Sequence, residues 1–129
     1  MVVVQDHNSS ECENWRPGVK TEVRASALTG AFQLCIFEQW CDVDLGAPTH
    51  IHAVEEVLEV ISGTATIWLD DDTMTVTANQ SVLIPRGARH GFKNIGDDTL
   101  HVRATLAASI FEASYDDRDE LSRRYAPIA

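Results

Sequence analysis

Turn-forming residues interrupt most of this chain about every eight to twelve residues, and the runs between them are short. These runs are rich in β-branched and aromatic residues, which pack well on the pleated surface of a sheet. Short strands at such regular spacing are typical of an all-β sandwich or barrel. We therefore predict one all-β domain, with strands at 21–28, 31–40, 56–61, 64–69, 73–78, 81–84 and 99–107.

The two ends of the chain depart from this pattern. Residues 1–18 are polar and irregular apart from a Pro-Gly turn signal, which predicts an N-terminal arm. Residues 114–125 begin with acidic side chains and end with two arginines, an order of charges that complements a helix dipole. The expected organisation is an arm over 1–18, a β-barrel over 19–112 and a short C-terminal helical tail over 113–129.

Composition restricts the class of partner. The chain has 129 residues, with 10 basic and 20 acidic side chains and a net charge of −10. Nucleic-acid binding depends on neutralising phosphates with Lys and Arg, so we expect no nucleic-acid partner. No run is long enough to cross a bilayer, and Cys12, Cys35 and Cys41 form no CxxC pair. We expect reduced thiols, a cytoplasmic location and no membrane partner.

The stretch HIHAVEEVLEVISG, residues 50–63, places two histidines one residue apart in front of two glutamates. Successive side chains of an extended chain point to opposite faces, so His50 and His52 share a face. Glu56 keeps the same even spacing, whereas Glu55 falls on the opposite face and is expected in solvent. The pattern predicts two imidazoles and one carboxylate on one side of the chain.

A second stretch, NQSVLIPRGARHGFKN at residues 79–94, contains a turn and another histidine. Pro85 presets its own φ and Gly87 permits a positive one, so the two residues predict a turn between strands. His90 follows on the returning strand, where it can face the side chains of a neighbouring strand. Asn94 is expected to tie down a turn with its amide.

Metal chemistry explains why the two stretches belong together. Three neutral imidazoles and a carboxylate suit a divalent transition ion, which here means Fe, Mn, Ni, Zn, Co or Cu. Four protein ligands on an ion that prefers six leave positions open for water, substrate or dioxygen, as in a catalytic site. A solvated strand edge could also carry polar residues, but it does not explain the spacing of Pro85, Gly87 and Asn94. The predicted ligands are His50, His52, Glu56 and His90.

Both stretches resemble the two motifs of the cupin family, G(x)5HxH(x)3–4E(x)6G and G(x)5PxG(x)2H(x)3N. The first is matched by GAPTHIHAVEEVLEVISG and the second by NQSVLIPRGARHGFKN. Two turn positions depart from the motifs: Gly46 stands three residues before the first histidine instead of five, and Asn79 replaces the opening glycine of the second motif. Asparagine also tolerates positive φ, so neither departure affects the ligands.

The resemblance implies a jelly-roll barrel of two antiparallel sheets with a metal ion held by the three histidines and the glutamate. It also implies a homodimer that exchanges or packs N-terminal strands, for which residues 19–28 are the candidate. Small cupins of similar layout include quercetin-dioxygenase-like and polyketide-cyclase-like proteins. The implied function is a metal-dependent enzyme on a small oxygenated substrate, of dioxygenase, isomerase or cyclase type; the alternative is a non-enzymatic binding module.

Few other residues invite a functional interpretation. In TLHVRATLA, residues 99–107, the even positions form the core face, which leaves His101 and Arg103 on the other face as weak candidates for substrate contact. Cys35 is interpreted as a small buried hydrophobe rather than a pocket residue. Trp40 and Trp68 are expected in the core or an interface. No nucleophile elbow, P-loop or dinucleotide motif is present.

Overall fold

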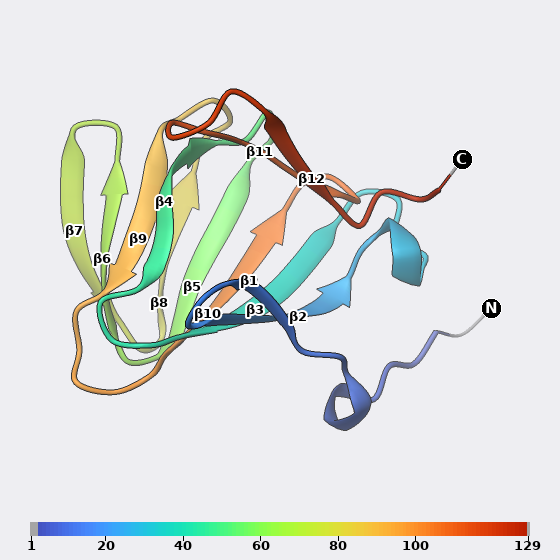
Figure 1. Cartoon of the computed structure of the whole chain (residues 1–129), viewed down its shortest axis with the longest axis horizontal. Coiled ribbons are helices and arrows are strands. Elements are labelled where there is room, and N and C mark those ends of the chain that lie inside the picture. Colours follow the sequence, from blue (N-terminus) through green and yellow to red (C-terminus); the bar gives the residue numbers. More distant parts are fainter. Residues whose placement is uncertain (1–2, 129) are drawn as a thin grey trace.

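The computed structural model describes residues 3–128, which form two antiparallel six-stranded sheets facing each other (Figure 1). One sheet has the order β1-β2-β3-β10-β5-β8 and the other β12-β11-β4-β9-β6-β7. The predicted all-β jelly roll is therefore confirmed. The elements are η1 (His7–Ser9), β1 (Glu13–Arg16), β2 (Val19–Ala25), η2 (Ala27–Thr29), β3 (Cys35–Cys41), β4 (Gly46–Ile51), β5 (Glu56–Ser62), β6 (Thr64–Leu69), β7 (Asp72–Thr77), β8 (Gln80–Ile84), β9 (His90–Asn94), β10 (Leu100–Leu106), β11 (Phe111–Tyr115) and β12 (Leu121–Arg124).

Alternate residues of the central strands fill the space between the sheets. Strand β10 buries its even positions and leaves its odd positions at least partly exposed. Strand β3 buries its odd positions in the same way, although Glu38 on the other face is buried as well. This period of two is the pattern expected of strands with one face on a core. Within residues 3–128, no helix has the length and apolar character needed to cross a membrane.

The turns that close the hairpins rest on residues with positive φ. Gly63, between β5 and β6, has a φ of 97°, and an added Cβ would lie 3.2 Å from the backbone of Leu100. Asn79, between β7 and β8, has a φ of 67°. The asparagine that replaces a motif glycine therefore occupies the left-handed region, as its residue type permits.

The predicted C-terminal helix is wrong. Residues 111–124 form the hairpin β11–β12 instead, which lies across one end of the molecule (Figure 1). Phe111, Ala113 and Tyr115 alternate toward the core, a period of two that the interpretation as a helix ignored. The charges that suggested a helix dipole act across the hairpin: the Arg123 guanidinium lies 2.7 Å from the Glu112 carboxylate.

Two strands lie outside the predicted barrel limits of 19–112. Strand β1 falls within the predicted arm and forms the edge of one sheet, and β12 falls within the predicted tail and forms the edge of the other. Residues 1, 2 and 129, at the ends of the predicted arm and tail, lie outside the described residues. The sheets therefore extend into both segments that the sequence separated from the barrel.

Candidate metal centre

Neighbouring strands of one sheet bring two of the three histidines together. His50 on β4 and His90 on β9 are directly opposite each other in the antiparallel ladder, so their side chains share a face. Their imidazole centroids lie 4.2 Å apart. His52 lies just past the end of β4, and its ring centroid is 4.8 Å from that of His50.

Glu56 reaches the same place from the opposite sheet. The sequence-based prediction placed Glu56 on the histidine face because it assumed that the chain stays extended from His50 to Glu56. That assumption is wrong, since β4 ends at Ile51 and the chain bends before β5. Glu56 is the first residue of β5, whose neighbours are β10 and β8. The bend therefore carries the carboxylate across the barrel to face the imidazoles, and it leaves Glu55 exposed, as expected.

The four side chains form one compact, buried cluster. A ligand atom from each of them lies within 4.8 Å of the others, and none of the four residues is more than 5% exposed. Glu56 Oε1 lies 3.1 Å from His52 Nε2 and 3.0 Å from His90 Nε2. A carboxylate this close to imidazole nitrogens requires a hydrogen atom or a metal ion between them.

Backbone carbonyls orient all three imidazoles in the same way. The Nδ1 atoms of His50, His52 and His90 lie 2.7, 2.8 and 3.0 Å from the carbonyl oxygens of Pro48, Glu112 and Ala88. A carbonyl oxygen only accepts, so each Nδ1 carries a hydrogen and donates it. The Nε2 atom of each ring is then the one available to a metal ion. Carbonyl partners of this kind fix the ring orientation of metal-binding histidines.

Burial and mutual charge set the protonation of the cluster. Burial, followed by the charges of His90 and His52, lowers the pKa of His50 to about 3. Burial also opposes the charge on Glu56, but hydrogen bonds from His52 and His90 outweigh it and lower the pKa of Glu56 to about 2. For His52, burial lowers the pKa, while the Glu56 hydrogen bond and charge outweigh burial and raise it. A neutral His50 and an ionised Glu56 are the forms that bind a metal ion.

The donor set fits a divalent transition ion. Imidazole nitrogens and a single carboxylate are borderline ligands, which suit Fe, Mn, Co, Ni, Cu or Zn rather than Mg or Ca. All four donors converge and all four are buried, so they can enclose an ion from one side. The cluster is therefore capable of holding a metal ion.

A cavity adjoins the cluster inside the barrel. It contains about 280 Å³ of space between its lining atoms, partly open to solvent, of which about 20 Å³ admits water-sized groups. That is room for about one water molecule. Beyond the cluster, the larger side chains that line the cavity are those of Trp15, Arg16, Phe37, Gln39, Phe111 and Tyr115.

Most of these cavity residues have no signal in the sequence motifs. Tyr115 lies directly opposite His50 across the β11–β4 ladder, a pairing that the interpretation of the tail as a helix excluded. Gln39 shares a face of β3 with Cys35 and Phe37. Its position two residues after Phe37 is the one feature of the sequence that predicts an inward-facing side chain here. Its Nε2 donates to Thr21 Oγ1 at 3.1 Å.

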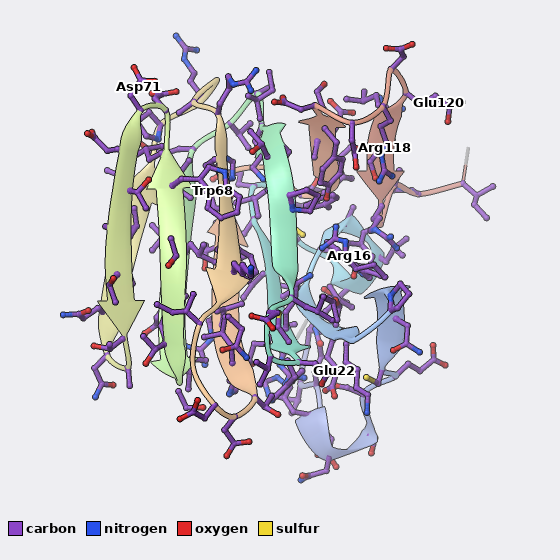
Figure 2. All side chains as sticks on the ribbon, turned by 60° about the vertical axis from the view of Figure 1, so that its left-hand side comes forward. Arg16, Glu22, Trp68, Asp71, Arg118 and Glu120 are labelled. Carbon is purple, nitrogen blue, oxygen red and sulfur yellow. The ribbon has the colours of Figure 1, made fainter. Side chains whose placement is uncertain are left out.

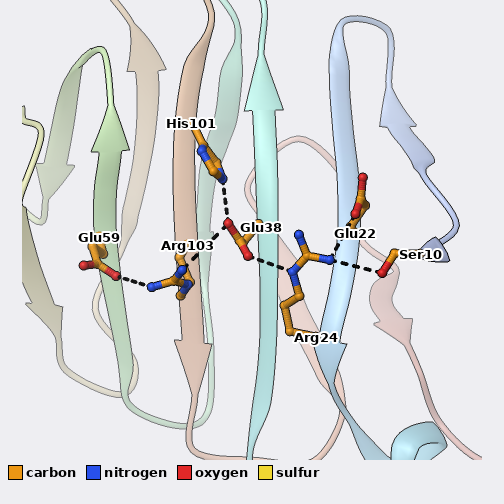
Figure 3. A network of polar contacts seen from close by, with 7 residues as sticks. All are labelled: Ser10, Glu22, Arg24, Glu38, Glu59, His101 and Arg103. Carbon is orange, nitrogen blue, oxygen red and sulfur yellow. Dashed lines mark hydrogen bonds and ion pairs between the residues drawn. The ribbon is translucent and has the colours of Figure 1, made fainter. Parts of the chain in front are cut away.

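His101 and Arg103 do not reach the cavity. Both lie on the opposite face of β10, where His101 Nε2 is 2.6 Å and Arg103 3.9 Å from the Glu38 carboxylate (Figure 3). Arg24 completes this network with a 2.7 Å contact to Glu38. Strand alternation directs both side chains away from the cavity, because the even positions of β10 face the core.

The remaining singled-out residues have structural roles. Asn94 Nδ2 donates to the carbonyls of Cys41 and Asp98 at 3.0 and 2.8 Å. Cys35 is buried, and burial, followed by the charge of Glu56, raises its thiol pKa to about 12. Trp40 stacks on His101 on the outer face of the sheet. Trp68 donates its indole N–H to Thr49 Oγ1 at 2.9 Å.

Comparisons with known proteins give the family and the fold. The curated alginate biosynthesis protein AlgA of Pseudomonas aeruginosa is 28% identical over 119 residues, covering 92% of this chain and 23% of that protein. Polyketide synthase CurC of Streptomyces cyaneus is 38% identical over 50 residues, covering 38% of this chain and 32% of that protein. The chain thus spans about a quarter to a third of the length of these relatives.

A similar solved structure is the polyketide cyclase RemF from Streptomyces resistomycificus. It has a TM-score of 0.75 and 19% identity, and the match covers 98% of this chain and 88% of that one. The family model described as "Cupin domain" matches residues 42–107, just over half of the chain and both halves of the metal cluster. The chain belongs to the cupin domain family.

Proposed function

We propose that this chain is a metal-dependent enzyme that acts on a small oxygenated organic substrate in the barrel cavity. His50, His52, Glu56 and His90 would hold a divalent transition ion through three Nε2 atoms and one carboxylate. The observation that carries the proposal is the convergence of these four buried donors beside a cavity. A cluster of this kind that serves only the fold has no need of an adjoining cavity.

The bound ion supplies a Lewis acid for the oxygen atoms of the substrate and for enolate-like negative charge. The chain's own residues would do the rest. Glu56, ionised and buried, offsets the charge of the ion, and the carbonyl-bound Nδ1 atoms hold the rings in place. Phe37 and Phe111 line the cavity with apolar surface, which strengthens electrostatic interactions inside it.

Among the reaction types that suit this site, we favour cyclase chemistry over dioxygenation and isomerisation. The support is that two comparisons converge: a polyketide synthase shares 38% of its residues with the chain over 50 positions, and a polyketide cyclase shares its fold over 98% of the chain. Cyclisation of a poly-β-ketone requires stabilisation of an enolate, which a Lewis-acidic ion beside the cavity would offer.

A cytoplasmic location and a homodimer through residues 19–28 remain proposals. These residues form β2 and η2, and β1 lies along their free side at the edge of the sheet. Strand exchange that involves β2 would therefore carry β1 with it. Light scattering coupled to size exclusion tests the dimer: a mass near 14.3 kDa, that of one chain, would exclude it.

The experiment that tests the proposed function is a product assay on metal-loaded protein with linear poly-β-ketone mimics that carry at least three ketone groups. Mass spectrometry should detect a cyclised product that lacks water relative to the substrate, and an oxygen electrode should record no uptake. The variant His90→Ala should lose the product, and His7→Ala, whose imidazole lies at the exposed N-terminal segment, should keep it. Oxygen uptake with oxygenated products would replace cyclase by dioxygenase chemistry.

Binding of these substrates to metal-loaded protein without turnover would instead favour the non-enzymatic binding module. Equal product yield from wild type and His90→Ala would contradict any role of the metal cluster in the reaction.

A further inference from the structure

A β-bulge points two consecutive side chains of β1 into the cavity. Adjacent residues of a regular strand face opposite sides, yet Trp15 and Arg16 both line the cavity. The register between β1 and β2 shifts between Asn14 and Arg16, and Arg16 rather than Trp15 stands opposite the fully buried Val19. A bulge of this kind re-aims a side chain and is over-represented beside active sites.

Arg16 and Arg86 are the two arginines of the described chain that have no carboxylate within 4.0 Å. Arg86 is exposed to solvent, whereas Arg16 is half-buried. The partners of Arg16 are neutral: it donates to the carbonyl of Gly46 at 2.9 Å and to the Tyr115 hydroxyl at 3.3 Å. A guanidinium has five N–H donors, so these two contacts leave three available.

The absence of a carboxylate beside Arg16 is notable because acidic side chains outnumber basic ones by 20 to 10. A half-buried guanidinium without a counter-ion is poorly solvated, and an anion beside it would be bound strongly. Arg118 also lies beside Tyr115, with its guanidinium carbon 4.8 Å from the ring centroid, but its charge is paired with Asp117 at 3.1 Å. Figure 2 shows Arg16 and Arg118 on the same side of the molecule.

The residues around Arg16 indicate the shape of the rest of the ligand. Trp15 lies 4.8 Å from Phe37 and 4.7 Å from Phe111 between ring centroids, so aromatic rings form one wall. The Trp15 indole N–H is buried on the side of Tyr125, whose ring centroid lies 6.3 Å from that of Trp15. A flat, conjugated body fits such an aromatic wall.

We propose that Arg16 recognises a carboxylate of the substrate in the cavity that adjoins the metal cluster. The substrate class is then a conjugated carboxylate with oxygen donors at its other end. The planar guanidinium fork matches a carboxylate in two parallel hydrogen bonds, which a lysine does not reproduce. The oxygen donors at the metal-binding end of the substrate follow from the proposed function. Recognition of the carboxylate by Arg16 does not depend on it.

The strand that carries Arg16 is also the part of the cavity lining that can move to admit a substrate. The cavity admits about one water molecule as it stands, so a substrate must displace part of its lining. Strand β1 has four residues and lies at a sheet edge, where it pairs with β2 alone. Short edge strands open at low free-energy cost because few contacts hold them. Movement of β1 would carry Trp15 and Arg16 together onto the ligand.

The test compares 3,4-dihydroxybenzoate with its methyl ester, which has the same two metal-binding hydroxyls and no charge. Dissociation constants are measured by calorimetry on metal-loaded protein. Wild type should prefer the carboxylate by about tenfold or more, the size of a charge-assisted hydrogen bond. The net charge of −10 disfavours any anion, so the preference cannot come from the overall field.

Arg16→Gln should remove the preference by weakening the carboxylate probe alone. Arg16→Lys should restore part of it, because the charge returns without the planar fork. Arg86→Gln is the matched control, since it removes the same charge from an exposed turn, and it should keep the preference. Equal loss in the Arg16 and Arg86 variants, or equal weakening of both probes by Arg16→Gln, would overturn the proposal.

A second arm separates this proposal from the proposed function. Metal-stripped protein is titrated with benzoate and methyl benzoate, followed by the NMR signals of the Trp15 indole and the Arg16 guanidinium. A preference for benzoate that Arg16→Gln removes supports carboxylate recognition even if the chain binds no metal. Metal binding without any carboxylate preference would overturn the recognition by Arg16 and leave the metal site unaffected.

Discussion

His90 Nε2 lies 3.0 Å from Glu56 Oε1, although the two residues are 34 positions apart and belong to different sheets. The contact exists only when both sheets face each other around a common core. It therefore couples the metal cluster to closure of the barrel. Because neither atom carries a hydrogen between them when His90 is the Nδ1–H tautomer, the pair needs a proton or a metal ion at this point.

Glu56→Gln should weaken metal binding without abolishing it. The amide oxygen remains as a donor, but the negative charge that offsets the ion is lost. We expect the metal dissociation constant to rise at least about tenfold, as seen when the support of a metal ligand is removed. A competition titration with a coloured chelator measures it. Glu55→Gln, one residue away and exposed, should leave the constant unchanged, and an equal effect of both variants would contradict the assignment.

Asn94→Ala should destabilise the protein by about 3 kcal/mol, or about 1 kcal/mol for each of three hydrogen bonds. The fully buried amide donates to two carbonyls and accepts from the Gly96 N–H at 2.9 Å. Urea unfolding measures the change. Asn8→Ala, at an exposed position, should stay within about 0.5 kcal/mol of wild type. A similarly small effect of Asn94→Ala would refute the role of Asn94 in holding the loop between β9 and β10.

Asn79 should tolerate glycine and reject a β-branched residue. Its φ of 67° lies in the left-handed region, which glycine adopts freely. Asn79→Gly should change the free energy of unfolding by less than about 1 kcal/mol. Asn79→Val should lower it by about 1–2 kcal/mol, the cost of a Cβ-branched side chain in that region. Thermal melts that rank valine above glycine would count against this account of the turn.

Glu38→Gln should flatten the pH dependence of stability. Burial opposes the charge of Glu38, but hydrogen bonds from Arg24 and His101 outweigh it and lower its pKa (Figure 3). A lowered folded-state pKa means that the stabilisation is present above the ordinary value of 4.5 and is lost as the pH falls through the folded value. We expect a loss of about 2 kcal/mol at pH 7 that shrinks toward pH 3.

Urea unfolding at several pH values checks this expectation. Glu59→Gln is the control, because Glu59 pairs with Arg103 on the same sheet face and both side chains are about 40% exposed. The Glu59–Arg103 pair should contribute less than about 1 kcal/mol to the free energy of unfolding. A gap between wild type and Glu38→Gln that stays constant from pH 7 to pH 3 would show that the Glu38 charge does not stabilise the fold.

The sequence predicts what depends on local spacing. The strand at 64–69 has the expected bounds, because alternating β-branched residues between Gly63 and an acidic turn leave little freedom. The four cluster residues are also identifiable, since short turns hold them at fixed spacing. The reasoning for Glu56 is nonetheless wrong: parity along one strand selected it, whereas the structure brings it from the opposite sheet after a bend.

Features that depend on long-range pairing are not predictable in this way. Tyr115 lies opposite His50 only because β11 adds to the edge of β4, a choice between distant segments that no local pattern encodes. Arg16 reaches the cavity through a bulge, which reverses the alternation that the sequence implies. The tail misleads because acidic and basic residues at its two ends suit a helix dipole and a hairpin equally well.

The central claim is that His50 and His90 bind the metal ion, and elemental analysis of purified, metal-loaded variants tests it most directly. Wild type and His7→Ala should each retain about one divalent ion per chain. His50→Ala and His90→Ala should lose most of it while circular dichroism still records a β-sheet protein. Unchanged metal stoichiometry in either of these two variants would contradict the account.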